Sequence, residues 1–176
     1  MSPQLSDALN IEKITALPFD QQYDTAWFTA QLAHKMSYYH MPTLVVKKDE
    51  LAVAIFFLDY GNKEYFYESF KKFPLNPVDH FLFICEAYAL ETTGALDDII
   101  GQAQPSKNPR SRETLMIYGE TKDGQRRSDC IPTDGKGPLL HEKDFDNVDC
   151  RWSETLFGRE WNSSIVINSK GKFDVH

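Results

Sequence analysis

The sequence lacks features that several large classes of protein require. Its three cysteines, Cys85, Cys130 and Cys150, show no Cys-x-x-Cys spacing, so neither a disulfide framework nor a zinc knuckle is expected. Basic residues are fewer than acidic ones, 19 against 26, and the net charge of −7 argues against a dedicated nucleic-acid binder. The longest apolar run, at 51–58, is far shorter than the ~20 residues that span a membrane.

Short signatures of enzymes and of secretion are missing as well. No P-loop, Gly-x-Gly-x-x-Gly or Gly-x-Ser-x-Gly pattern occurs, and the Asp-Gly-Lys-Gly-Pro loop at 134–138 resembles a phosphate loop only in its glycines. The start, residues 1–14, has no apolar signal region. We therefore expect a cytoplasmic protein with reduced thiols, no cofactor and no metal site.

The residues that are present suffice for one packed domain. The composition, 41% apolar and 13% aromatic, predicts a packed hydrophobic core. The length of 176 residues predicts a single domain over 1–176. We expect residues 1–19 to form a tail or a short leading turn, and the end from residue 170 to be frayed.

Apolar spacing predicts two helices. The first is expected at 21–38 with Asp20 as its N-cap. Its apolar stripe consists of Tyr23, Trp27, Ala30 and His34, widened by Phe28 and Leu32. The second is expected at 63–73, where phenylalanines recur at helical spacing and a proline follows.

Between and after these helices the pattern predicts strands. A hairpin is expected from 43–46 and 51–59, a strand at 81–90, a second hairpin from 114–121 and 125–132 around Asp123-Gly124, and a last strand at 164–168. The fold class is α+β, a mainly antiparallel sheet of about five strands with two main helices packed on it. If strands 51–59 and 81–90 are parallel, their crossover is right-handed.

Two glutamates are the candidate catalytic residues. Glu86 lies among apolar strand residues and must be paired, hydrogen-bonded or protonated. If the strands that contain Glu86 and Glu120 pair so that both side chains lie on one face of the sheet, the two carboxylates could share a proton, hold a cation or clamp an arginine. The alternative is a structural ion pair of Glu86 with Arg110 or Arg112. We predict both carboxylates on one face, with Arg110 or Arg112 nearby; a shift of one residue in register would separate them.

The segment 105–127 is basic although the chain is acidic. Its basic residues are Lys107, Arg110, Arg112, Lys122, Arg126 and Arg127. Arginine forks suit phosphate and carboxylate groups, so Lys107 and the four arginines are the candidate binding residues for a small phosphate-bearing or acidic ligand. The alternative is a solvated hairpin and loop.

Two metal hypotheses carry less support. Asp144-x-Asp146 resembles the start of a calcium loop, but Asp149 stands where the loop requires glycine. A site from His80, His141 and an aspartate has no metal-ligand spacing. The alternative, which we expect, is a half-buried His34 and two exposed loop histidines.

One stretch carries a resemblance. The strand Phe-Ile-Cys-Glu-Ala-Tyr at 83–88 is followed by a loop containing Pro and Ser and by Pro-Arg-Ser-Arg-Glu-Thr-Leu-Met-Ile at 109–117. A strand ending in Glu-Ala-aromatic, then a Pro-x-Arg-x-Glu entry to a second strand ending in a glutamate, here Glu120, resembles small uncharacterised bacterial and phage-type proteins. The likeness covers roughly residues 40–132 and departs from the pattern at Tyr88, where tryptophan is more usual. It implies strands and no activity.

Two functions follow from these observations. The first is a non-catalytic binding or protein-interaction module, in which exposed aromatics form a homodimer patch: Tyr38, Tyr39, Tyr65 and Tyr67. The second is a small enzyme or a nucleotide or phosphate-ligand binder that uses Glu86, Glu120 and the arginines, with 91–111 as a lid. Neither a membrane nor a nucleic acid is expected as a partner.

Overall fold

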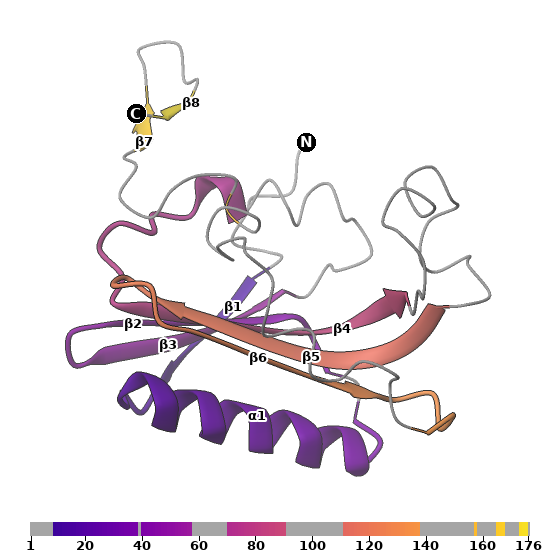
Figure 1. Cartoon of the computed structure of the whole chain (residues 1–176). Coiled ribbons are helices and arrows are strands. Elements are labelled where there is room, and N and C mark those ends of the chain that lie inside the picture. Colours follow the sequence, from indigo (N-terminus) through magenta and orange to yellow (C-terminus); the bar gives the residue numbers. More distant parts are fainter. Residues whose placement is uncertain are drawn as a thin grey trace.

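The computed structural model of the chain describes residues 9–38, 40–57, 70–90, 111–137, 157, 165–167 and 173–175. Its elements are β1 (Leu9–Ile14), α1 (Phe19–Lys35), β2 (Thr43–Lys48), β3 (Leu51–Phe57), β4 (His80–Leu90), β5 (Ser111–Thr121), β6 (Arg126–Pro132), β7 (Ile165–Ile167) and β8 (Phe173–Val175). Figure 1 shows α1 lying along one face of the main sheet. In the described ranges no helix combines the length and apolar character needed to cross a bilayer.

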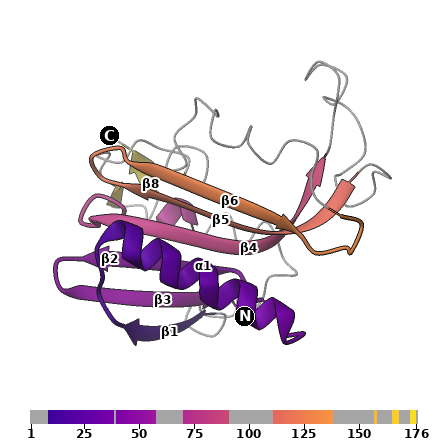
Figure 2. The same ribbon diagram turned by 60° about the horizontal axis from the view of Figure 1, so that its bottom comes forward.

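The main sheet has six strands in the order β1-β3-β2-β4-β5-β6, and every neighbouring pair is antiparallel. Figure 2 shows this order with α1 in front of the sheet. The expected α+β class with a mainly antiparallel sheet is confirmed, but the strand count is six rather than five. β3 and β4 each pair antiparallel with β2, so they run parallel to each other with β2 between them.

The sixth strand comes from the leading segment. β1 pairs with β3 from Leu9 opposite Phe57 to Ile14 opposite Ala52, so the expectation of a tail or turn over 1–19 is wrong for these residues. The strand has a weak apolar pattern because it lies at the edge of the sheet and residues 10–13 are all exposed. Near the other terminus, Phe173–Val175 pairs with β7 although this end was expected to be frayed.

The other predicted elements are found with shifted bounds. α1 begins and ends earlier than the predicted 21–38, and its N-cap residue is Pro18, so Asp20 lies in the first turn instead. Both predicted hairpins are present, and Gly124 takes the positive φ of 96° that the second turn needs. Of the second helix predicted at 63–73, residues 70–72 are helical, and 63–69 lie outside the described residues.

The two faces of the sheet are packed differently. Under α1 the core contains mainly aliphatic side chains, with Phe19 and Tyr23 from the helix itself. On the opposite face the core is aromatic. There Phe70 stacks on Phe57 with 5.1 Å between ring centroids and meets Phe83 edge-on at 5.1 Å and Phe157 at 5.4 Å. These rings fix the turn at 70–72 and residue 157 on the sheet.

The close approach of α1 to the sheet depends on a glycine in β5. A Cβ atom at Gly119 would lie 2.5 Å from Cδ2 of Leu82 and 3.0 Å from Cε2 of Phe19. Leu82 is directly opposite Gly119 on β4, and Phe19 is the first residue of α1. Any side chain at this position would therefore displace the first turn of the helix or the neighbouring strand.

The other end of α1 is closed by a Schellman motif with a strained residue. The N–H of Ser37 donates to the carbonyl of His34 at 2.9 Å, and the N–H of Tyr38 donates to the carbonyl of Ala33 at 3.0 Å. Ser37 has a φ of 61°, a left-handed conformation that suits glycine better than a residue with a Cβ.

We expect Gly119→Ala to lower the free energy of unfolding by about 1–3 kcal/mol, because the added methyl group overpacks the contact between α1 and the sheet. Urea denaturation followed by circular dichroism measures this change. The control is Glu113→Ala, an exposed position of the same strand, which should change stability by less than about 0.5 kcal/mol. Equal denaturation curves for Gly119→Ala and the wild type would contradict the role of the glycine.

We expect Ser37→Gly to raise the free energy of unfolding by about 0.5–1 kcal/mol, since glycine adopts the positive φ without a Cβ clash. Ser37→Ala keeps the Cβ and serves as the matched control, with no gain expected. Thermal unfolding of the three proteins decides between them. A gain of the same size in both variants would attribute the effect to the lost hydroxyl instead.

Candidate functional site

The two candidate glutamates lie on opposite faces of the sheet. In the β4–β5 register Glu86 is opposite Leu115 and Glu120 is opposite Phe81. Leu115 belongs to the core under α1, whereas Phe81 belongs to the aromatic core on the other side. The predicted pair of carboxylates on one face is therefore wrong. The two strands do pair antiparallel, but the register, which the sequence leaves open, separates the two side chains.

The surroundings of the two glutamates also differ. Glu86 is exposed, although Leu82 and Ile84 on the same face of β4 are fully buried. Its Oε1 accepts a hydrogen bond from the backbone N–H of His40 at 3.3 Å. Glu120 has no exposed surface. The expectation of a buried acid thus fails for Glu86, because this end of β4 lies beyond the buried contacts of α1.

Arg112 forms a buried ion pair with Asp134, not with Glu86. Its Nε donates to Oδ2 of Asp134 at 2.6 Å and its NH2 donates to Oδ1 at 2.9 Å, in the two-point geometry that arginine favours. NH2 also donates to the carbonyl of Gly137 at 2.7 Å. The hydrogen bonds from Arg112 hold the pKa of Asp134 down at about 2. The pair fixes the loop after β6 to the start of β5.

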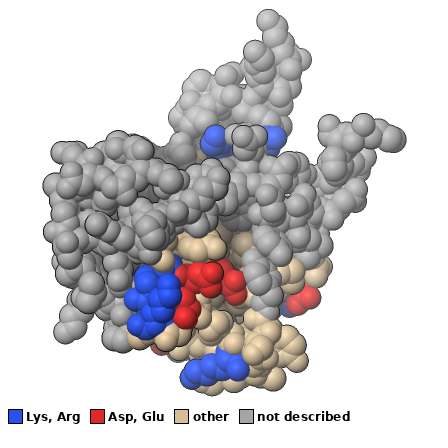
Figure 3. Space-filling view, turned by 90° about the vertical axis from the view of Figure 1, so that its right-hand side faces the viewer, with Lys and Arg blue, Asp and Glu red and all other residues tan. Residues whose placement is uncertain are grey.

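The glycine-containing loop at 134–137 is held by the chain's own carboxylate. Asp134 Oδ1 accepts the backbone N–H of Lys136 at 3.0 Å, and Gly135 and Gly137 both have positive φ. An N–H group that could meet a phosphate is thus already paired with a carboxylate of the chain. Figure 3 shows the end of the molecule at which β4 ends and β5 begins, with acidic and basic side chains side by side. This mixed charge does not favour an anion over a cation.

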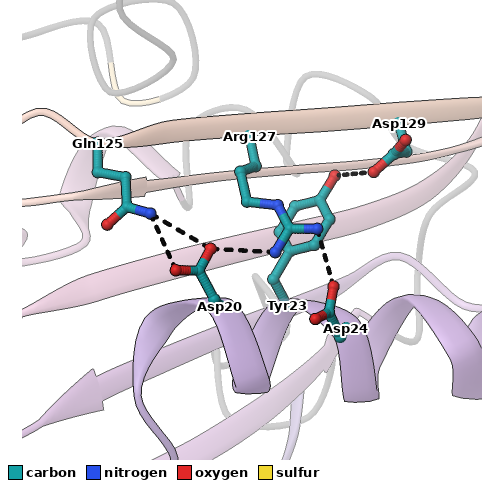
Figure 4. Close-up of polar contacts among 6 residues, drawn as sticks. All are labelled: Asp20, Tyr23, Asp24, Gln125, Arg127 and Asp129. Atoms are coloured by element: carbon teal, nitrogen blue, oxygen red, sulfur yellow. Dashed lines mark hydrogen bonds and ion pairs between the residues drawn. The ribbon is translucent and has the colours of Figure 1, made fainter.

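Arg127 on β6 ties the sheet to α1, as Figure 4 shows. Its NH1 donates to Oδ1 of Asp20 at 3.1 Å and its NH2 donates to Oδ1 of Asp24 at 2.8 Å. Its guanidinium carbon lies 4.1 Å from the ring centroid of Tyr23, a cation–π contact. The Tyr23 hydroxyl donates to Oδ2 of Asp129 at 2.9 Å. This network packs α1 onto the hairpin of β5 and β6.

The basic segment is therefore divided among different roles. Arg112 and Arg127 hold elements together, and Lys122 donates from Nζ to the carbonyl of Asn76 at 3.3 Å. Arg126 is exposed. Lys107 and Arg110 lie outside the described residues, as does all of the expected lid at 91–111 except Ser111, which begins β5.

The metal hypotheses gain no support from the described ranges, in which no three His, Cys, Asp or Glu side chains gather closely enough to hold a metal ion. His141 and the acidic residues 142–149 lie outside those ranges. Cys85 and Cys130 are free thiols, as expected, and Cys150 is not among the described residues. Burial raises the pKa of the Cys85 thiol to about 12, which keeps it protonated and unreactive at neutral pH.

His80 is buried rather than an exposed loop residue. It is the first residue of β4, is 3% exposed, and pairs with Lys47 on β2 and Thr121 on β5. Its ring meets the ring of Phe19 edge-on at 5.5 Å. Nε2 has no hydrogen-bond partner in the described part of the chain. Burial, together with the charge of Lys47, lowers the pKa of His80 from 6.5 to about 4.

The feature that the sequence analysis missed is an exposed apolar row on α1. Phe28 is 68% exposed, Leu32 46% and Met36, just past the end of the helix, 58%. Phe28 and Leu32 had been assigned to the buried stripe of Tyr23. A helical wheel would have separated them, because Leu32 follows Tyr23 by nine residues, and nine steps of about 100° end on the opposite side of a helix. Of the tyrosines expected to form a dimer patch, Tyr38 is 63% exposed, and Tyr39, Tyr65 and Tyr67 lie outside the described residues.

We expect the free energy of unfolding to fall as the pH is lowered from 6.5 to about 4. In this range the unfolded chain takes up a proton on His80 and the folded protein does not, so protonation favours unfolding by up to about 2–3 kcal/mol. Urea denaturation across the range measures the slope, which His80→Gln should flatten. The control Val78→Ala removes buried methyl groups and should lower the whole curve in parallel. An unchanged slope in His80→Gln would contradict the assignment.

Any function must be inferred from the chain's own residues. The chain matches no protein-family model, no curated protein and no solved structure. The contacts, exposure and charge described above therefore carry the functional argument.

Proposed function

We propose that this chain is a non-catalytic protein-interaction module that binds an amphipathic helix of a protein partner along the outer face of α1. The observation that carries the proposal is the row of Phe28, Leu32 and Met36, which are large, apolar and spaced four residues apart. Residues at i, i+4 and i+8 lie along one side of a helix, so their exposed surfaces are continuous. Continuous exposed apolar surface on a folded protein is typical of an interaction site.

The shape of this surface favours a helix as its occupant. The row from Phe28 to Met36 covers about 12 Å of a convex helix that is 17 residues long. A second helix packs on such a ridge by placing its own apolar side chains between Phe28 and Leu32.

The charges along α1 indicate the direction in which a partner helix runs and where its own charges lie. Asp20 lies in the first turn and Asp24 in the next, while His34 and Lys35 lie in the last turn. Although Asp20 and Asp24 contact Arg127, their side chains remain 61% and 68% exposed. A partner helix that runs antiparallel to α1, with acidic residues near its own N-terminus and basic residues near its C-terminus, meets opposite charge at both ends.

The alternative function, an enzyme or phosphate-ligand binder, has less support from the described residues. Glu86 and Glu120 lie on opposite faces, and Arg112 and Arg127 are engaged by aspartates of the chain. Where a pocket with paired glutamates was expected, β4 and β5 present one exposed and one buried carboxylate.

The proposal predicts that the protein binds a fluorescein-labelled synthetic helix with an apolar stripe, an acidic N-terminal turn and a basic C-terminal turn. Fluorescence anisotropy measures the affinity. Phe28→Ser should weaken binding by at least about tenfold, because a buried aromatic contact is lost.

The matched control is Ile11→Ser, which removes another exposed apolar side chain, 61% exposed, from β1 on the opposite face of the sheet. This variant should bind as the wild type does. A peptide with the same stripe and reversed charges should bind more weakly. Equal binding by Phe28→Ser and the wild type, or no binding by the wild type, would refute the proposal.

A further inference from the structure

We infer that the helix bound by α1 is α1 of a second copy of this chain, packed antiparallel across a twofold axis. This inference rests on the proposed function and names its partner. α1 itself has the features required of that partner: an apolar row, acidic residues near its N-terminus and basic residues near its C-terminus. A surface that is complementary to itself in this way forms a closed dimer about a twofold axis.

The axis can be placed from the positions along the helix. Phe28 and Leu32 are equidistant from the level of Ala30, so a twofold axis at that level packs Phe28 of each copy against Leu32 of the other. Ala30 itself is buried on the inner face and does not enter the contact. The same axis brings Thr25 of one copy opposite Lys35 of the partner subunit and Asp24 opposite Met36 of the partner subunit, so the apolar contact is made by Phe28 and Leu32 and the charged contact by Asp24 and Lys35. Both contacts occur twice in the dimer.

Charge favours this antiparallel arrangement over a parallel one. In a parallel pair Asp20 and Asp24 would meet their own counterparts, and Lys35 would meet Lys35 of the partner subunit. In the antiparallel pair Asp24 lies near Lys35 of the partner subunit, Asp20 lies beyond the end of the partner's helix, and the helix dipoles oppose each other. Arg127 holds Asp24 from the sheet side, which leaves the exposed side of this carboxylate available to Lys35 of the partner subunit.

The size of the contact sets the strength of the dimer. With the axis at Ala30, the two copies of α1 overlap over residues 25–35, a contact about 16 Å long and one helix wide, which places the interface at the small end of specific protein contacts. The dimer is therefore expected to be reversible and dependent on protein concentration.

The test is sedimentation velocity of the full chain over a range of concentrations, with a charge exchange. Thr25→Lys places a lysine opposite Lys35 of the partner subunit, and Lys35→Glu places a glutamate beside Asp24 of the partner subunit. Each single variant should weaken the dimer by about threefold to tenfold, and the double variant should restore it. Thr25 and Lys35 are ten residues apart in one helix, about 15 Å, so the rescue cannot arise within one chain.

The control variants separate this inference from the proposed function. Phe28→Ser should abolish the dimer and Ile11→Ser should leave it intact. A chain that binds the synthetic helix but stays monomeric at all concentrations would overturn the second copy as partner and retain the interaction module. A dimer that persists in the Phe28→Ser variant, or a double charge variant whose dimer affinity is not restored, would also overturn the antiparallel α1 contact. Failure of both peptide binding and dimerisation would refute the two proposals together.

Discussion

β4 and β5 are each 11 residues long and pair with each other along their whole length, and this register constrains the rest of the structure. It places Gly119 opposite Leu82, which leaves room for the first turn of α1 above the sheet. It also directs alternate side chains of both strands into two different cores, one aliphatic and one aromatic. A shift by a single residue would exchange these faces, so the register is fixed by the burial of both sets of side chains at once.

α1 has two faces with different roles. Its inner face buries Phe19, Tyr23 and Ala30, and the network around Arg127 fixes its rotation about its own axis. With the rotation fixed, Phe28 and Leu32 point away from the sheet. An exposed apolar row on a mobile helix could turn inward, but here the ion pairs and the cation–π contact with Tyr23 prevent this. The same contacts that hold the helix on the sheet therefore present its outer face to a partner.

The candidate site illustrates how a sequence argument can be right about residue types and wrong about their placement. Glu86 was singled out because a charged group beside apolar strand residues needs compensation, Arg112 as a fork for phosphate or carboxylate groups, and His80 as a possible metal ligand. Arg112 pairs not with Glu86 but with Asp134, which is 22 residues away in the chain. Glu86 instead remains exposed, and His80 is buried in its neutral form, with its pKa lowered by burial. Pairings of this kind depend on loops and strand order that no local pattern encodes.

The sequence by itself determined the local elements of this protein. β-Branched residues mark β2, a continuous apolar run marks β3 and apolar alternation marks β4. Asp123-Gly124 marks the hairpin of β5 and β6, and the spacing of Tyr23 and Ala30 marks the inner face of α1, because each signal depends only on neighbours along the chain. The edge strand β1, the face on which each glutamate lies and the partners of the arginines were decided by the tertiary structure. They arise from contacts between segments distant in sequence, where register and burial, rather than local propensity, select one arrangement.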